Sequence, residues 1–279
     1  MADFAIKTAP QTDDWDGIVD VWKTADDIEL FSSAWNFDHL YPLRTHPSNP
    51  CMEGWVTLTA LAQVTSRLRI GSMVNGMHFR HPAVTANMAA SLDIISGGRL
   101  NLGLGAGWYE PEDEAYGLGL GTVRERMDRF EEGVEVIVDL LSKETTTFDG
   151  EYYQMKDAWC EPKGPQRPHP PIAIGGRGEK RTLRIVAKWA QWWDALMTDP
   201  DEWTRLNGVL LGHCEAVGRD PSEITRSVHI GWSDDVASQE VAERSAALFE
   251  AGVDVVVLSM REPFTGSRVE DVAKVLSAI

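Results

Sequence analysis

The sequence contains few cysteines and comparatively few cations. Cys51, Cys160 and Cys214 lie far apart and form no Cys-x-x-Cys pair, so the sequence predicts neither a disulfide framework nor a metal site of the zinc type. The 26 Lys and Arg residues are outnumbered by 43 Asp and Glu residues, which gives a net charge of −17. Because affinity for a phosphate backbone needs clustered cations, this balance argues against a nucleic-acid partner.

Long apolar runs and fixed repeats are also missing. The sequence contains no run of about 18 consecutive apolar residues, the length that a membrane-spanning helix needs. Its first residues also lack the basic segment and following apolar run of a secretory signal peptide. We therefore expect a cytoplasmic protein with no membrane partner. A hydrophobic fraction of 43% and an aromatic fraction of 9% are ordinary for a chain with a large core.

Short β-branched or apolar runs alternate along the chain with longer amphipathic stretches. This alternation is typical of parallel strands joined by helices. Thr122 and Glu125 form a capping-box pattern at the start of one such helix, and Pro82 is well placed in the first turn of another. The candidate strands are residues 4–9, 33–37, 68–74, 100–106, 171–175, 192–197, 227–231 and 254–259.

Eight strands followed by helices predict a (β/α)8 TIM barrel of the α/β class. We expect a single domain over residues 1–279, with residues 145–170 as an excursion between strands 4 and 5 that holds a small strand pair. An open doubly wound sheet shares the alternation. The absence of Gly-x-Gly-x-x-Gly after the first strand favours the barrel.

In a barrel of this type the chemistry is placed where the strands end. The second candidate strand ends at Asp38 and His39, an acid next to an imidazole, which suits proton transfer or polar contacts with a cofactor and equally suits a local hydrogen bond. The fourth runs through alternate glycines to Gly107. These strip one face of side chains, so that a flat ring or another backbone can approach.

The fifth candidate strand ends in a glycine-rich turn, Gly175-Gly176-Arg177-Gly178, which leads into a helix. Free amide groups at a helix start attract anions, and Arg177 adds a fork of donors. The turn therefore predicts a phosphate site.

Several segments together resemble the luciferase-like monooxygenase superfamily, and within it the F420-dependent oxidoreductases. The run Ser-Gly-Gly-Arg-Leu-x-Leu-Gly-x-Gly-x-Gly is the most specific of them. The segments that carry the resemblance are residues 35–42, 53–55, 68–71, 80–82, 92–100, 103–108, 148–150 and 168–176.

The resemblance implies a luciferase-like barrel that holds coenzyme F420, a deazaflavin, at its mouth and transfers a hydride to or from a small organic substrate. The F420-dependent relatives have an Asp-His pair after strand 2, here Asp38 and His39, with His39 as the catalytic residue. A non-proline cis peptide would map to Met73 and Val74. The further cofactor contacts implied are Asn75, Gly76, Ala106, Gly107, Trp108, Gly175, Gly176, Arg177 and Gly178.

One departure concerns Trp108. F420-dependent glucose-6-phosphate dehydrogenases have a Glu in its place, so that substrate is disfavoured, and neither Glu110 nor Glu112 can be given the role by proximity in sequence. Two alternatives stay open: an FMN-dependent monooxygenase with a separate reductase, and a barrel that binds a cofactor without turnover. Substrate contacts are expected on the loops 43–50, 111–122 and 263–267, and a homodimer is left open.

Overall fold

The computed structural model describes residues 2–43 and 45–279, so Arg44 in the 43–50 loop and Met1 lie outside it. Within this part of the chain, eight parallel strands close into a barrel, because β3 at one end of the sheet order pairs with β5 near the other. The barrel strands are β1 Asp3–Thr8, β2 Phe31–Asn36, β3 Arg69–Ser72, β5 Leu100–Gly105, β8 Ile172–Gly175, β9 Trp192–Asp194, β10 Thr225–Trp232 and β11 Val255–Met260. The predicted TIM barrel is confirmed.

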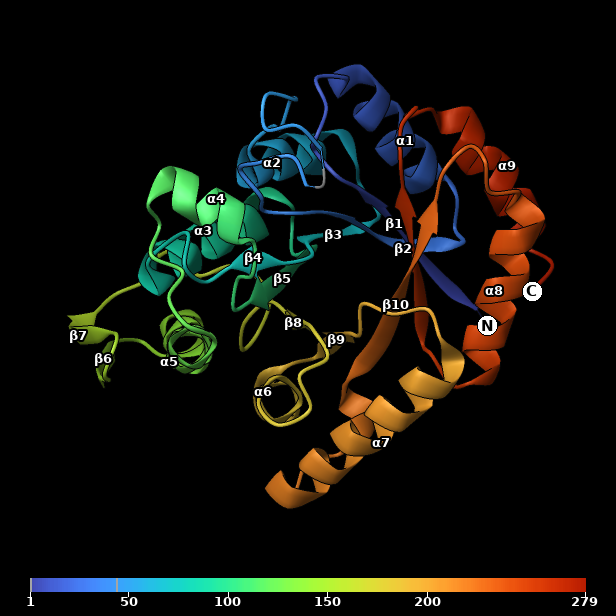
Figure 1. The fold of residues 1–279 in the computed structure, drawn as a ribbon. Helices are drawn as coiled ribbons and strands as arrows, with labels where there is room; N and C mark the ends of the chain where they lie inside the picture. The colour runs from blue at the N-terminus through green and yellow to red at the C-terminus, as the bar shows by residue number, and fades with distance from the viewer. Residues whose placement is uncertain (1, 44) are drawn as a thin grey trace.

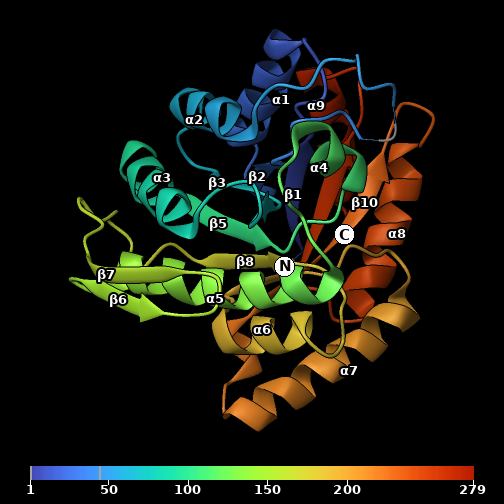
Figure 2. The same cartoon turned by 60° about the vertical axis from the view of Figure 1, so that its left-hand side comes forward.

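Helices surround the strands, as Figures 1 and 2 show. Most of them carry an apolar face that packs on the barrel, for example Phe130, Val134, Ile137 and Leu141 in α5, whereas α4 buries only Glu112. The helices are α1 Trp15–Asp27, α2 Gly54–Val64, α3 Pro82–Ile95, α4 Glu110–Tyr116, α5 Val123–Ser142, α6 Thr182–Trp189, α7 Pro200–Val217, α8 Ser238–Glu250 and α9 Gly266–Leu276. A 3-10 turn, η1 Pro221–Glu223, precedes β10.

The local signals for two helices are present as predicted. The Thr122 hydroxyl accepts from the amide of Glu125, and the Glu125 carboxylate accepts from the amide of Thr122. Pro82 stands in the first turn of α3. The last helix, α9, begins at Gly266 after its N-cap residue Thr265.

The excursion between β5 and β8 holds the expected strand pair, β6 Thr146–Asp149 and β7 Gln154–Ala158, which is antiparallel. The Glu132 carboxylate of α5 accepts from the backbone amides of Glu151 and Tyr152, both at 2.9 Å, and so holds the hairpin against α5 (Figure 2). The prediction that residues 111–122 form a loop is partly wrong, because the first half of this segment belongs to α4. Pro111 in the first turn and three acids there favour a helix at this point.

Two strand ends differ from the predicted ones in a way that shapes the site. The third strand stops at Ser72 instead of Val74, and the chain resumes pairing only in β4, Asn75–Gly76; the Met73–Val74 peptide between them is cis. β9 ends at Asp194 instead of residue 197, and Leu196 has a positive φ of 50°.

The interior of the barrel is a separate, smaller core with polar groups in it. Trp35 and Trp192 meet inside it with ring centroids 5.3 Å apart. Lys7, Asp194 and Ser227 are buried beside this apolar cluster. No helix in the described part of the chain is long and apolar enough to cross a membrane.

Candidate active site

The chain after β2 places His39 against Glu112 of α4. Nδ1 of His39 lies 2.9 Å from Oε2 of Glu112, and Oε1 of the same carboxylate accepts from the amides of Leu40 and Tyr41. The Glu112 side chain is fully buried, whereas that of His39 is 13% exposed. A carboxylate that accepts from Nδ1–H fixes the ring orientation and leaves Nε2 as the free nitrogen.

Aromatic rings surround the His39 imidazole. Its ring centroid lies 5.1 Å from that of Phe37, 5.7 Å from that of Trp108, 6.0 Å from that of Tyr109 and 6.3 Å from that of Phe79, all edge to face. The Trp108 side chain is 53% exposed, so it forms the outer rim of this wall. The result is an imidazole in an aromatic recess that is partly open to solvent.

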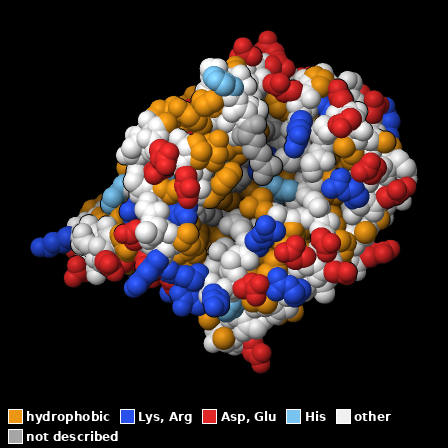
Figure 3. Space-filling view, in the orientation of Figure 1, with side chains coloured by type: hydrophobic (Ala, Val, Ile, Leu, Met, Phe, Trp, Pro, Cys, Tyr) orange, Lys and Arg blue, Asp and Glu red, His pale blue; other side chains and the backbone are white. Residues whose placement is uncertain are grey.

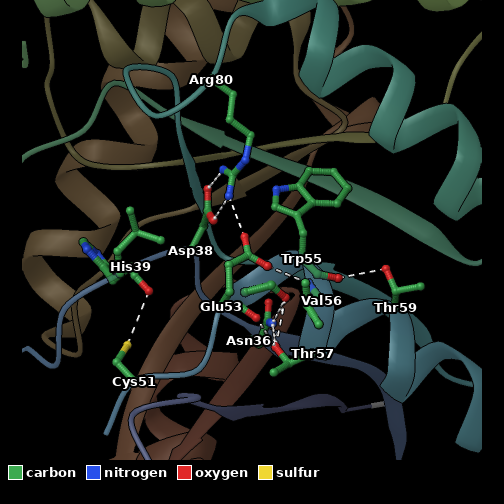
Figure 4. A network of polar contacts seen from close by, with 12 residues as sticks. Asn36, Asp38, His39, Cys51, Glu53, Trp55, Val56, Thr57, Thr59 and Arg80 are labelled. Carbon is green, nitrogen blue, oxygen red and sulfur yellow. Dashed lines mark hydrogen bonds and ion pairs between the residues drawn. The ribbon is translucent and has the colours of Figure 1, made fainter. Parts of the chain in front are cut away.

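Asp38 does not pair with its neighbour His39. Its carboxylate is buried and receives two hydrogen bonds from Arg80, at 2.6 and 3.0 Å, and Arg80 also contacts Glu53 at 2.6 Å (Figure 4). Glu53 in turn caps α2 by accepting from the amide of Val56. Burial raises the pKa of Asp38 to about 6 and Arg80 opposes the rise, so the carboxylate is charged at neutral pH. Its predicted contact with a cofactor stays a prediction.

Cys51 contributes no nucleophile to this region. Its thiol lies 3.4 Å from the carbonyl oxygen of His39, to which it donates (Figure 4). Burial, followed by the nearby Glu112 charge, raises the pKa of the thiol to about 12. The reactive thiolate is therefore scarce at neutral pH.

The cis bond between Met73 and Val74 is present where the resemblance places it. The ammonium of Lys7 donates to the Met73 carbonyl at 3.0 Å, and the amide group of Asn75 donates to the Gly103 carbonyl at 2.6 Å. A Cβ on Gly103 would lie 1.8 Å from the Ser72 carbonyl oxygen. These contacts fix the bulge to β1 and β5.

The alternate glycines therefore make room for the bulge. A Cβ on Gly105 would lie 2.6 Å from a Val74 methyl, and one on Gly175 would lie 3.2 Å from the other. The sequence analysis allowed either a flat ring or another backbone to approach these glycines. At Gly103 the approaching group is the backbone of Ser72. Val74 itself thereby comes to lie between the ends of β5 and β8.

Polar atoms without a partner flank the bulge. Within the described residues, the Ser72 hydroxyl, Oδ1 of Asn75, Oδ2 of Asp194 and both ring nitrogens of His78 are buried and make no hydrogen bond. Burial lowers the pKa of His78 to about 4, so its ring is neutral and offers one donor and one acceptor. Buried polar groups need partners. This mixture of acceptors and possible donors fits a heteroaromatic ring with N–H and carbonyl groups, as in a flavin or deazaflavin.

The turn after β8 retains only part of the predicted anion site. Gly176 has a φ of 129°, and its amide is already used, since it donates to the Asp194 carbonyl at 2.9 Å. Arg177 is 60% exposed and lies 3.8 Å from Glu202. α6 follows; its N-cap residue Arg181 makes no side-chain capping bond, but in the first turn the amide of Leu183 already donates to the Gly178 carbonyl at 3.1 Å.

The structure thus brings the four predicted strand ends together but leaves the Arg177 side chain outside the group. His39 contacts Trp108, and Val74 contacts Gly105 and Gly175, whereas Arg177 points to Glu202. Sequence reasoning missed the side chains supplied by other elements. They are Lys7, His78, Arg80, Glu112, Asp194 and His229.

A family model described as luciferase-like monooxygenase matches residues 2–271. The chain belongs to this family. Among curated relatives, it is 31% identical over 227 residues to an F420-dependent hydroxymycolic acid dehydrogenase of Mycobacterium tuberculosis, with 80% of this chain and 60% of the relative aligned. It is 32% identical over 215 residues to an F420-dependent glucose-6-phosphate dehydrogenase of Kineococcus radiotolerans, with 76% of this chain and 63% of the relative aligned.

The chain spans only about half to three-fifths of the length of these curated relatives, and 52% of a protein of Mycobacterium bovis. Over 126 residues the chain is also 36% identical to the pyrimidine monooxygenase RutA of Cronobacter sakazakii, covering 44% of this chain and 37% of that one. Two solved structures share the fold along nearly their whole length.

The first of these structures is an F420-dependent secondary alcohol dehydrogenase bound to an F420-acetone adduct, with a TM-score of 0.87, 19% identity and coverage of 100% of this chain and 99% of that one. The second is the coenzyme F420-dependent tetrahydromethanopterin reductase of Methanopyrus kandleri, with a TM-score of 0.84, 20% identity and 99% coverage of both chains.

Proposed function

We propose that this protein is an oxidoreductase that transfers a hydride between coenzyme F420 and an uncharged organic alcohol or carbonyl compound. The observation that carries the proposal is the His39–Glu112 pair in its aromatic recess. The unpartnered polar atoms of Ser72, Asn75 and His78 support a ring site beside it. The F420-dependent relatives favour F420 over FMN for that ring.

When bound, F420 supplies the hydride acceptor or donor. The chain's own part is to hold a proton at the right place. His39 Nε2 takes the proton of a substrate hydroxyl during oxidation, or gives one to a carbonyl oxygen during reduction. Glu112 keeps the imidazole oriented and balances the charge it gains when protonated.

The recess favours a substrate without an anionic group at the reacting end. The rings of Phe37, Phe79, Trp108 and Tyr109 line it, and its nearest charge is the carboxylate of Glu112. The nearby cation Arg80 is already bonded to Asp38 and Glu53. A phosphate or carboxylate next to His39 would therefore be repelled without a compensating partner.

The cofactor assignment is tested by thermal stabilisation. F420 and FMN are each titrated to a hundredfold excess over their dissociation constants, where one bound ligand adds about 2.7 kcal/mol to the free energy of unfolding. We expect saturable stabilisation by F420 at a lower concentration than by FMN. Tighter binding of FMN would favour the FMN-dependent monooxygenase, whereas F420 binding without hydride transfer to any alcohol or ketone would favour a binding protein.

A homodimer also stays a proposal, and one surface suits it. A groove of about 870 Å³ between α2 and α3 lies outside the barrel mouth and is lined mainly by apolar and small side chains, with Val56 70% and Val84 50% exposed. The lining contains no charged residue, so two copies of a protein with net charge −17 could meet there with least repulsion. Light scattering of the wild type and of Val56→Glu decides whether this face holds a second copy.

A further inference from the structure

The short helix α4 is held to the barrel by very little buried surface. Of its seven residues only Glu112 is buried, and five are exposed. None of the described residues 107–121 belongs to either hydrophobic core. Figure 2 shows α4 between the two loops that join it to β5 and α5, and Figure 3 shows Asp and Glu side chains on the near surface where α4 lies. Little apolar area therefore keeps this helix in place.

The polar and aromatic contacts of α4 lead to the chain after β2. The Glu112 carboxylate lies 2.9 Å from Nδ1 of His39 and accepts from the amides of Leu40 and Tyr41. At the end of the helix, the Tyr116 ring meets the Tyr41 ring edge to face, with 5.2 Å between the centroids. Hydrogen bonds to a carboxylate are strong, but water can replace them when the groups separate. These contacts can therefore form and break without unfolding the barrel.

The two segments that join α4 to the barrel meet at their base. A Cβ on Gly107 would lie 3.0 Å from a methyl group of the buried Leu120. Residues 108–119 thus form a loop whose ends are close together, as in an Ω-loop. After α4, Gly117 and Gly119 have left-handed backbone, with φ of 65° and 75°, and a Cβ on either would meet nothing within 4 Å. Backbone rotation in this segment would therefore disturb no packed neighbour.

Two hydrogen bonds fasten the base of this loop. Nη1 of Arg129 in α5 donates to the Gly119 carbonyl at 2.7 Å, and the Leu120 amide donates to Oδ1 of Asp113 at 2.6 Å. The Arg129 guanidinium is itself held over the Tyr152 ring, 5.7 Å from its centroid. These contacts fix where the loop is attached. They leave α4 free to turn about the attachment once the Glu112 and Tyr116 contacts break.

We propose that residues 108–119 form a lid over the His39 recess and that Glu112 is its latch. This inference deepens the proposed function and rests on it. The lid carries Trp108 and Tyr109 to the aromatic wall and Glu112 to the imidazole, so its closing completes the recess and orients His39 in one movement. Its opening exposes the recess and lets a ligand enter. His39 is thus prepared for proton transfer only while the recess is closed.

Amide hydrogen exchange, followed by NMR, measures the opening of the lid. The amides of Leu40 and Tyr41 lose their acceptor Glu112 when the lid opens, whereas amides inside α5 stay bonded until the protein unfolds. Exchange is compared among the wild type, Tyr116→Ala, which removes the ring contact, and the control Trp159→Ala. Tyr116 is 54% exposed and Trp159 is 59% exposed, so both variants remove an exposed ring, but Trp159 follows β7 and lies outside the lid.

We expect the Leu40 and Tyr41 amides of the wild type to exchange at least about 100-fold faster than the amides inside α5, because a local opening is more frequent than unfolding. Tyr116→Ala should speed this exchange by about a further tenfold, the upper range for the loss of one aromatic pair. Exchange inside α5 should not change, and Trp159→Ala should behave as the wild type. Exchange at Leu40 and Tyr41 as slow as inside α5, in both the wild type and Tyr116→Ala, overturns the lid.

A ligand distinguishes failure of the lid from failure of the proposed function. Saturating F420 should slow exchange at Leu40 and Tyr41 by about tenfold or more, because a ligand in the recess favours the closed lid. F420 that binds without slowing this exchange overturns the lid as a cover for the recess and leaves the proposed function standing. If F420 does not bind, the proposed function is overturned, and the exchange rates of the free protein still decide whether the lid opens.

Discussion

Oε2 of Glu112 lies 2.9 Å from Nδ1 of His39, although the two residues are 73 positions apart in the chain. The contact joins the end of β2 to α4, the short helix after β5. The same carboxylate accepts from two backbone amides of the β2 exit, so it orders the backbone and the ring together. Under the proposed function, proton transfer by His39 would then depend on a residue that touches no reacting atom.

Replacing His39 by alanine should separate catalysis from binding. General acid or base work of this kind contributes roughly 10² to 10⁴ in rate, so His39→Ala should lower kcat by about that factor. The dissociation constant of F420 should change less than tenfold, because the ring site rests on other residues. Single-turnover reduction of bound cofactor, compared with titrated affinity, measures both. His169→Ala, before the start of β8, is the control, and an unchanged rate in His39→Ala would remove His39 from the mechanism.

Glu112→Gln should lower kcat by about 10² while leaving F420 affinity within threefold of the wild type. The glutamine keeps the size and one acceptor oxygen, but it loses the negative charge that stabilises a protonated imidazole. A merely structural role would instead lower the melting temperature without moving the pH profile of kcat. Glu110→Gln, on the exposed side of the same helix, is the matched control. Equal pH profiles in the two variants would contradict the assignment.

The contrast between Thr122 and Glu112 indicates what the sequence alone can predict. The capping box joins Thr122 to Glu125, three positions later, so it can be read from the local sequence. The alternation of strands and helices likewise predicts the barrel. The partner of His39 is a matter of tertiary packing. Nothing near His39 in the sequence marks Glu112, and the adjacent acid, Asp38, is bonded to Arg80 instead.

The sequence predicts which residues lie in a strand, but not which side chains they meet inside the barrel. Lys7 and His229 sit in otherwise apolar or β-branched runs that predict strands, and both do lie in strands. That their side chains meet Met73 inside the barrel follows only from how β1, β3 and β10 close around it. The cis bond at Met73 and Val74 was predictable from the family resemblance alone, because no residue there requires it.

Gly107→Ala should destabilise the protein more than Gly119→Ala. Both glycines have left-handed backbone, with φ of 84° and 75°, so each alanine costs roughly 1 to 2 kcal/mol of backbone strain. A Cβ on Gly107 would also lie 2.3 Å from Nδ1 of the half-buried His78, whereas one on Gly119 meets nothing within 4 Å. We expect an additional loss of about 1 to 3 kcal/mol for Gly107→Ala in denaturant unfolding. Equal losses would mean that His78 moves away freely.

The buried ammonium of Lys7 should make stability depend on pH in a defined window. It donates to the Met73 carbonyl at 3.0 Å and faces Asp194 of β9 and His229 of β10, which lie 3.2 Å from each other. Burial lowers the pKa of Lys7 from 10.5 to about 8, and attraction by Asp194 opposes the change. Burial also lowers the pKa of His229 from 6.5, so that group does not titrate in the same range.

Between pH 8 and pH 10.5 the unfolded chain keeps the Lys7 proton while the folded chain has lost it. The unfolded state therefore binds more protons there, and the stability contributed by Lys7 rises with pH and is lost as the pH falls through 8. Relative to Lys7→Met, which cannot titrate, the wild type should gain at most about 3 kcal/mol across this window. Urea unfolding at pH 7.5, 9 and 10 measures the gain, with Lys23→Met on the exposed face of α1 as the control. Parallel pH curves for the wild type and Lys7→Met would show that the buried lysine keeps its ordinary proton affinity.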